Sequence, residues 1–176
     1  MDGPYLSGTQ DTAAIEDAKR EQEKQLAGLA VDLLDHLTNI RDFDSDILQH
    51  HMSPRIVNLQ YFGVMESKWN AHRREDLFAV VEQHAANNPD YHFQINAEGA
   101  SAEIFGDANR RATVWVPASC HGFQEGEERM PLRECIVRMQ WRRRMPEEAA
   151  EGIVARWVCE RMVASSAAGG FIGIDA

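Results

Sequence analysis

Apolar residues in the first third of the chain recur three and four positions apart, the spacing of an amphipathic helix. The stripe consists of Leu26, Leu29, Ala30, Leu33, Leu34, Leu37 and Ile40. The residues before it, 16–25, are charged on all sides and predict a helical stretch that projects into solvent or packs on a partner. Residues 1–13 are polar and contain two glycines and a proline. They predict a disordered leader ahead of a single domain over 14–176.

Two shorter helices and a strand follow. N-cap residues and an apolar period predict helices over about 46–51 and 72–86. Between them, residues 55–62 are β-branched and aromatic and predict a strand. Pro54 should end the first of these helices and Pro89 the second.

After Pro89 the helical period gives way to alternation between apolar and polar residues, which is typical of strands. Five strands are predicted, over residues 91–97, 100–105, 112–123, 132–143 and 153–164. Helices first and strands afterwards indicate an α+β fold, and short connections indicate an antiparallel meander. The long strands must twist and curve. We therefore expect a cone-shaped α+β barrel, with the N-terminal helices packed on a strongly curved antiparallel sheet around a small-molecule pocket.

Charge and composition exclude several partners. The formal net charge of -10 argues against nucleic acid, because phosphate contacts need clustered Lys and Arg. The basic run Arg142–Arg144 is interpreted as a solvated hairpin end. No stretch approaches the roughly 20 apolar residues that span a bilayer, and no secretory signal is apparent. The three cysteines are predicted to be buried free thiols in a reducing, cytoplasmic compartment.

Motifs for cofactors and metals are missing from the chain. It contains no GxGxxG, GxxxxGK[ST], GxSxG, CxxC or HExxH. Adjacent strand residues such as Cys120 and His121 point to opposite faces and cannot share a metal. We expect neither a cofactor nor a metal ion.

Candidate chemistry emerges when the strands are sorted by face. One face of strand 112–123 mixes Trp115 with Ser119 and His121, a composition typical of ligand pockets. In the next strand, Glu134 and Arg138 share a face. They either form an ion pair that faces solvent or lie inside the cone. Inside the cone, the carboxylate of Glu134 would act as an acid or a base.

Two strand histidines, His92 and His121, have side chains suited to proton transfer near neutral pH, although a structural role fits each of them as well. His84 falls on the apolar face of its helix and reads as a core histidine. Arg41, at the end of the long helix, either favours the helix dipole or reaches a ligand oxygen at the mouth of the cone.

The chain resembles the nuclear-transport-factor-2-like superfamily, in particular its branch of SnoaL-like polyketide cyclases and scytalone dehydratases, of the type found in fungal secondary metabolism. The resemblance spans about residues 15–172 and follows the order of the elements. Short stretches of similar sequence occur at residues 89–95, 112–116, 133–143 and 156–159.

This resemblance implies a cofactor-free pocket, often in a homodimer, and aldol cyclisation, dehydration, isomerisation or rearrangement. We therefore expect a homodimeric lyase or isomerase acting on a polyketide- or terpenoid-like small molecule. His121 or Glu134 would move a proton, with His92 as the second sheet histidine and Arg41 stabilising negative charge on oxygen. The substrate contacts are expected from Asn58, Tyr61, Phe62, Trp115 and Arg138.

Two points qualify the implied reaction. The adjacent Tyr-Asp pair that scytalone dehydratase places at its first helices has no counterpart here, where Asp35 and His36 stand instead.

The second function considered is a non-catalytic binding or protein-interaction subunit, like the small subunits of aromatic-ring dioxygenases. In that case the charged residues 16–24 would be the partner surface.

Overall fold

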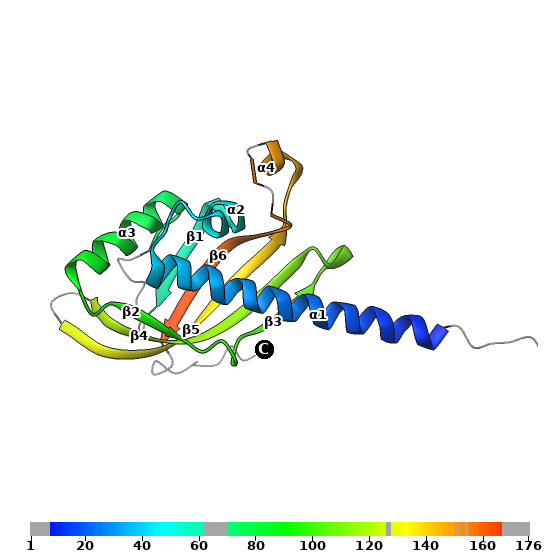
Figure 1. Cartoon of the computed structure of the whole chain (residues 1–176), viewed down its shortest axis with the longest axis horizontal. Coiled ribbons are helices and arrows are strands. Elements are labelled where there is room, and N and C mark those ends of the chain that lie inside the picture. Colours follow the sequence, from blue (N-terminus) through cyan, green and yellow to red (C-terminus); the bar gives the residue numbers. More distant parts are fainter. Residues whose placement is uncertain (1–7, 62–69, 126–127, 151, 154, 167–176) are drawn as a thin grey trace, which may run out of the picture.

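The N-terminal apolar stripe forms one long helix that crosses a curved sheet. In the computed structural model, which describes residues 8–61, 70–125, 128–150, 152–153 and 155–166, helix α1 spans Gly8–Asp35 and continues as a π-helical turn, η1 (His36–Ile40). Leu33 in the stripe is completely buried. The charged first half of α1 extends beyond the sheet (Figure 1). Helix α1 begins at Gly8, six residues before the predicted start of the domain at residue 14.

The next elements follow the predicted order. They are helix α2 (Asp46–His51), strand β1 (Met52–Tyr61) and helix α3 (Arg74–Asn87). Pro54 lies inside β1 and not between the helix and the strand. β1 tolerates it because this strand is at the edge of the sheet, where a missing N–H breaks no inner ladder.

Five further strands complete the sheet. They are β2 (His92–Ile95), β3 (Ser101–Phe105), β4 (Arg111–Glu125), β5 (Glu128–Arg143) and β6 (Trp157–Ser166), with a 3-10 turn η2 (Asp107–Asn109) and a short helix α4 (Pro146–Ala150) between them. The order is β1-β6-β5-β4-β2, and β3 also pairs with β4. Helices α1, α2 and α3 lie on one side of this sheet (Figure 1). The predicted cone of helices on a curved sheet is confirmed.

One pairing differs from the predicted antiparallel sheet. The pairs β2–β4, β3–β4, β4–β5 and β5–β6 are antiparallel, whereas β1 pairs with β6 in parallel. A parallel partner needs a long crossover connection. Here α3 and the whole meander lie between the two strands, so β1 can take the edge beside the last strand.

The helix-covered face of the sheet holds the core. On β4 this face carries small and β-branched apolar residues, all of them buried: Ala112, Val114, Val116, Ala118 and Cys120. They pack in one cluster with Leu33 and Leu37 and with Met139 and Trp141 of β5. All three cysteines are buried and none of them forms a disulfide, as predicted. Even the longest described helix is too polar to qualify as a membrane span.

A glycine in β4 lets the chain before β2 approach the sheet. Gly122 has φ +67°, and a Cβ there would lie 2.7 Å from the backbone carbon of Asp90 and the backbone nitrogen of Tyr91. Both the left-handed conformation and this close approach require glycine. The position of Tyr91 at the end of the cone therefore depends on Gly122.

We expect Gly122→Ala to lower the free energy of unfolding by about 1–2 kcal/mol from the left-handed backbone alone, and further through the clash with Asp90 and Tyr91. Gly28→Ala is the matched control. Gly28 is exposed in α1 with nothing within 4 Å of an added Cβ, so alanine should stabilise the helix by about 0.5–1 kcal/mol. Urea unfolding of both variants measures the difference. Equal stabilities of the two variants would contradict this role of Gly122.

Candidate functional site

A histidine and a tyrosine meet inside the cone where α3 ends and β2 begins. His84 of α3 is 3% exposed, and Tyr91, just before β2, is 7% exposed. Their rings meet edge to face, with centroids 4.4 Å apart and planes at 80°. Phe93 also packs edge to face with Tyr91, with ring centroids 5.9 Å apart. Two side chains with exchangeable protons thus share one buried site, here called the His84–Tyr91 pair.

The turn that joins α3 to β2 positions this pair. The side-chain amide of Asn88 donates to the carbonyl of His84 at 2.9 Å, and the N–H of Tyr91 donates to the carbonyl of Asn88 at 2.9 Å. Asn88 therefore closes the helix and starts the next segment, in the manner of a polar C-cap. The Asn-Asn-Pro sequence that ends the helix therefore also sets the distance between His84 and Tyr91.

Burial dominates the electrostatics around Tyr91. It raises the pKa of the phenol well above its ordinary value, and the neighbouring Cys120 and Cys135 raise it further, whereas the charge of Arg41 opposes the shift. Burial also raises the pKa of Cys135, to about 11. A buried hydroxyl and a buried thiol therefore stay protonated at neutral pH. Tyr91 is thus a hydrogen-bond donor and not a phenolate.

Arg41 approaches this site from the end of the long helix. It has φ 57° and ψ 34°, a left-handed cap whose backbone N–H donates to the carbonyl of His36 at 2.8 Å. Asn39, two residues before Arg41, holds this end of the helix to β2. Its amide donates to the carbonyl of Phe93 at 2.9 Å and accepts from the N–H of Phe93 at 2.8 Å. The side chain of Arg41 is exposed, and its positive charge lowers the pKa of Tyr91 against the larger effect of burial.

The other predicted catalytic residues lie on the opposite face of the sheet. The face of β4 that carries Trp115 and His121 is half-buried and points away from the helices, while the alternate residues fill the core. Glu134 and Arg138 of β5 are exposed on that same outer face. The interpretation of the Trp115–His121 face as the inner wall of the cone is therefore wrong. Alternation defines two faces, but only the packing of α1 decides which one is covered.

The outer face nevertheless brings the predicted residues close together. His92 of β2 pairs with His121 of β4, and their rings stack with centroids 4.4 Å apart and planes at 10°. In the next row Ser119 pairs with Glu134, and both line an open cavity of about 540 Å³. Trp115 pairs with Arg138 further along the strands. His92, His121 and Glu134 therefore belong to one outer polar surface.

Of the remaining predicted contacts, Asn58 lies in the cone. Its side chain is buried, and its backbone pairs with that of Ala71 through hydrogen bonds of 2.7 and 3.0 Å. Tyr61 ends β1, but its side chain and the whole of Phe62 lie outside the described residues. Among the described residues no group of three or more His, Cys, Asp or Glu side chains is placed to hold a metal ion.

Sequence reasoning missed Tyr91 and assigned His84 to the core. The available signal was weak: a histidine on an apolar helix face and a tyrosine directly after Asn-Asn-Pro-Asp. Neither residue type is unusual in a core by itself. What makes them a candidate site is their contact, which only the folded chain shows.

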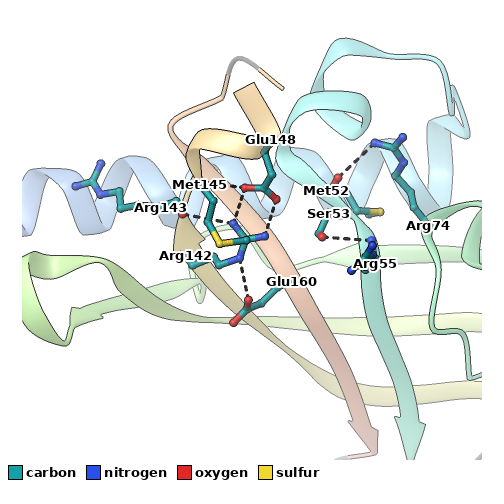
Figure 2. A network of polar contacts seen from close by, with 9 residues as sticks. All are labelled: Met52, Ser53, Arg55, Arg74, Arg142, Arg143, Met145, Glu148 and Glu160. Atoms are coloured by element: carbon teal, nitrogen blue, oxygen red, sulfur yellow. Dashed lines mark hydrogen bonds and ion pairs between the residues drawn. The ribbon is translucent and has the colours of Figure 1, made fainter. Parts of the chain in front are cut away.

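A second polar network joins α4 to the sheet (Figure 2). Both oxygens of Glu148 accept from the guanidinium of Arg142, at 2.6 and 2.5 Å, and the Nε of Arg142 donates to Glu160 at 3.0 Å. The N–H of Met145 also donates to Glu148, at 2.9 Å. These bonds, the Arg142 bond first, lower the pKa of the Glu148 carboxyl, and Glu148 in turn raises the pKa of Arg142. The network holds the short α4 against the ends of β5 and β6.

Because the pKa of Glu148 is lowered in the folded state, its contribution to stability is present above the ordinary carboxyl pKa of about 4.3 and is lost as the pH falls through the folded value. We expect Glu148→Gln to lower the free energy of unfolding by about 2 kcal/mol at neutral pH. The gap to the wild type should close in acid. Glu147→Gln, at the exposed neighbouring position, is the control. Urea unfolding across the acid range tests this, and a gap that does not change with pH would count against it.

Comparison with known proteins shows the fold. The association domain of CaMKII from C. elegans has a TM-score of 0.53 at 14% identity, over 85% of this chain and 98% of that one. Naphthalene 1,2-dioxygenase with indole bound in its active site has a TM-score of 0.54 at 12% identity, over 92% and 89%. A protein from Novosphingobium aromaticivorans, described as NTF2-like with a cystatin-like fold, has a TM-score of 0.52 at 14% identity, over 96% and 95%.

The chain therefore has the nuclear-transport-factor-2-like fold that its sequence resembles. No protein-family model matches the chain, and neither does any curated protein. At these identities the structures establish the fold and nothing finer. The matches include an oxygenase and an association domain, so the fold alone does not separate an enzyme from an assembly module.

Proposed function

We propose that this chain is a cofactor-independent enzyme, a lyase or isomerase that performs acid–base chemistry on a small organic molecule bound in the cone. The observation that carries the proposal is the buried His84–Tyr91 pair. Apolar side chains would fill this position at lower cost, because burying polar groups requires compensating interactions. Titratable groups held in such surroundings are concentrated at functional sites.

Each group has a role that follows from its surroundings. Tyr91 remains a neutral phenol, so it can donate a hydrogen bond to a carbonyl oxygen of the substrate and stabilise the negative charge that develops there. His84 can take a proton from the carbon next to that carbonyl and return it to another atom. Removal of that proton produces an enolate, whose negative charge is stabilised by the positive charge of Arg41 at the mouth of the cone. Return of the proton to another carbon of the enolate produces an isomerisation, whereas its transfer to a β-hydroxyl, whose C–O bond breaks and which leaves as water, produces a dehydration.

The apolar surroundings favour an apolar substrate. Phe93 packs against Tyr91, Cys120 and Cys135 lie close enough to raise its pKa, and Tyr91 belongs to the large apolar core cluster. Together with the sequence resemblance, this supports a polyketide- or terpenoid-like ketone as the substrate class. In this proposal His84 and Tyr91 perform the acid–base chemistry that the sequence had assigned to His121, His92 and Glu134. Arg41 and Asn58 retain the roles predicted for them in the cone.

An aromatic bicyclic ketone, β-tetralone, serves as the probe. We expect the protein to speed the exchange of its α-protons for deuterium, followed by NMR. His84→Gln should slow that exchange about 100-fold or more, the usual contribution of a general base. Tyr91→Phe should slow it about 100-fold through the lost donor, with circular dichroism showing that both variants fold.

His92→Gln and Glu134→Gln are the matched controls, because both residues are exposed on the outer face. They should leave the exchange rate unchanged. If these two variants abolish exchange and the cone variants do not, the outer polar surface is the active site. No acceleration over buffer by the wild-type protein would contradict the proposal altogether.

The second candidate function is a protein-interaction subunit, and exposed apolar groups favour it. Ile15 on the projecting half of α1 is 69% exposed, and Trp115 and Ile136 stand half-buried on the outer face of the sheet. Such a face could join two copies of the chain, consistent with the expected homodimer.

We expect sedimentation equilibrium to show a dimer that Ile136→Lys weakens at least about tenfold, the effect of burying an unpaired charge in an interface. Ile15→Lys on the projecting helix is the matched control for an interface confined to the sheet. A monomeric wild-type protein would contradict the outer-face dimer and leave the enzyme proposal intact.

A further inference from the structure

A cavity of about 650 Å³ opens where β4 begins and β5 ends, and most of its lining residues are arginines. They are Arg110, Arg111, Arg142, Arg143, Arg144 and Arg156. The chain has 18 Lys and Arg in all and a net charge of -10, so one third of its positive side chains surround one cavity in an acidic protein. No Asp or Glu of the described chain is among the lining residues.

Strand pairing creates this cluster from three separate segments. Arg111 lies directly opposite Arg142 in the β4–β5 ladder, and the N–H of Arg143 donates to the carbonyl of Arg110 at 2.9 Å. The N–H of Arg144 donates to the carbonyl of Arg156, before β6, at 3.1 Å. The run of arginines seen in the sequence is therefore only half of the basic site.

Three of the arginines have partners within the protein. Arg142 is paired with Glu148 and Glu160 in the network of Figure 2. The guanidinium of Arg143 lies 4.2 Å from the centre of the Trp157 ring. Arg144 donates to the carbonyl of Ile153 at 2.7 Å. These contacts fix the walls of the cavity.

The other three arginines have no such partner among the residues that the structure describes. Arg110, Arg111 and Arg156 are exposed, and no carboxylate in the described ranges forms an ion pair with them. Like charges opposite one another across strands are destabilising. The charge of Arg156 also lowers the pKa of Arg143, after the larger effect of burial. The cluster therefore carries positive charge that the protein itself does not neutralise.

We propose that this cavity binds a small soluble anion that carries two or more phosphate groups. The planar fork of a guanidinium pairs with phosphate oxygens through two parallel hydrogen bonds, and several forks around one space suit several phosphates. The volume lies in the range of small-molecule sites, roughly 300–1,000 Å³. The overall negative charge of the chain disfavours a long polyanion such as nucleic acid.

This site is distinct from the His84–Tyr91 pair and does not depend on it. Arg111 begins β4, whereas Cys120, the strand residue that pairs with Phe93 beside Tyr91, lies nine positions further along the strand. Loss of anion binding would leave the acid–base proposal untouched, and the reverse also holds.

Titration calorimetry with pyrophosphate at constant ionic strength tests the proposal on the full-length protein. The triple variant R110Q/R111Q/R156Q should weaken binding at least about tenfold, because each charged hydrogen bond contributes on the order of 1.5–3 kcal/mol and about 1.4 kcal/mol is tenfold in affinity. The control triple R20Q/R55Q/R73Q removes the same charge from exposed arginines elsewhere. It should retain the wild-type affinity.

Several results would overturn the proposal. They are the absence of pyrophosphate binding, an equal loss of affinity in both triple variants, and tighter binding to a short single-stranded DNA or to vesicles of anionic lipid than to pyrophosphate. Thermal unfolding with and without pyrophosphate checks that the variants fold, since a bound ligand must raise the midpoint of the wild type.

Discussion

Packing of the apolar stripe of α1 against one face of β4 and β5 is the contact on which the rest of the structure depends. Leu33 and Leu37 lie in one buried cluster with Val114, Met139 and Trp141. Burying each such side chain contributes roughly 1.5–3 kcal/mol, before the cost of ordering the chain. The same packing assigns the faces of every strand, because the covered face becomes the inside of the cone and its alternate residues the outside.

The two ends of the sheet carry different chemistry as a result. At one end the turn between α3 and β2 carries the buried His84–Tyr91 pair, held by Asn88 and by the close approach over Gly122. Low polarity there keeps the phenol protonated. At the other end the strand termini gather arginines around an open cavity, where solvent and two carboxylates reduce the repulsion. Apolar packing in the middle separates a neutral proton-donating site from a cationic one.

Much of the fold was predictable from local pattern. The helical stripe, the helix over 46–51 and the change of period after Pro89 all correspond to observed elements, because side-chain periodicity follows directly from helix and strand geometry. The pairing of β1 with β6 was not predictable, since it joins segments about 100 residues apart in the chain. Pro54 inside β1 shows the same limit, because only the position at the sheet edge makes it acceptable.

By itself the sequence determined which residues share a strand face, so it correctly grouped His121 with Trp115 and Glu134 with Arg138. Only the tertiary structure decided that these groups lie outside the cone. Alternation shows which residues share a face, but it does not show which face the helices cover. The same is true of both sites. His84 and Tyr91 meet across a turn, and the arginines meet across strand pairs, so both depend on contacts that no local pattern contains.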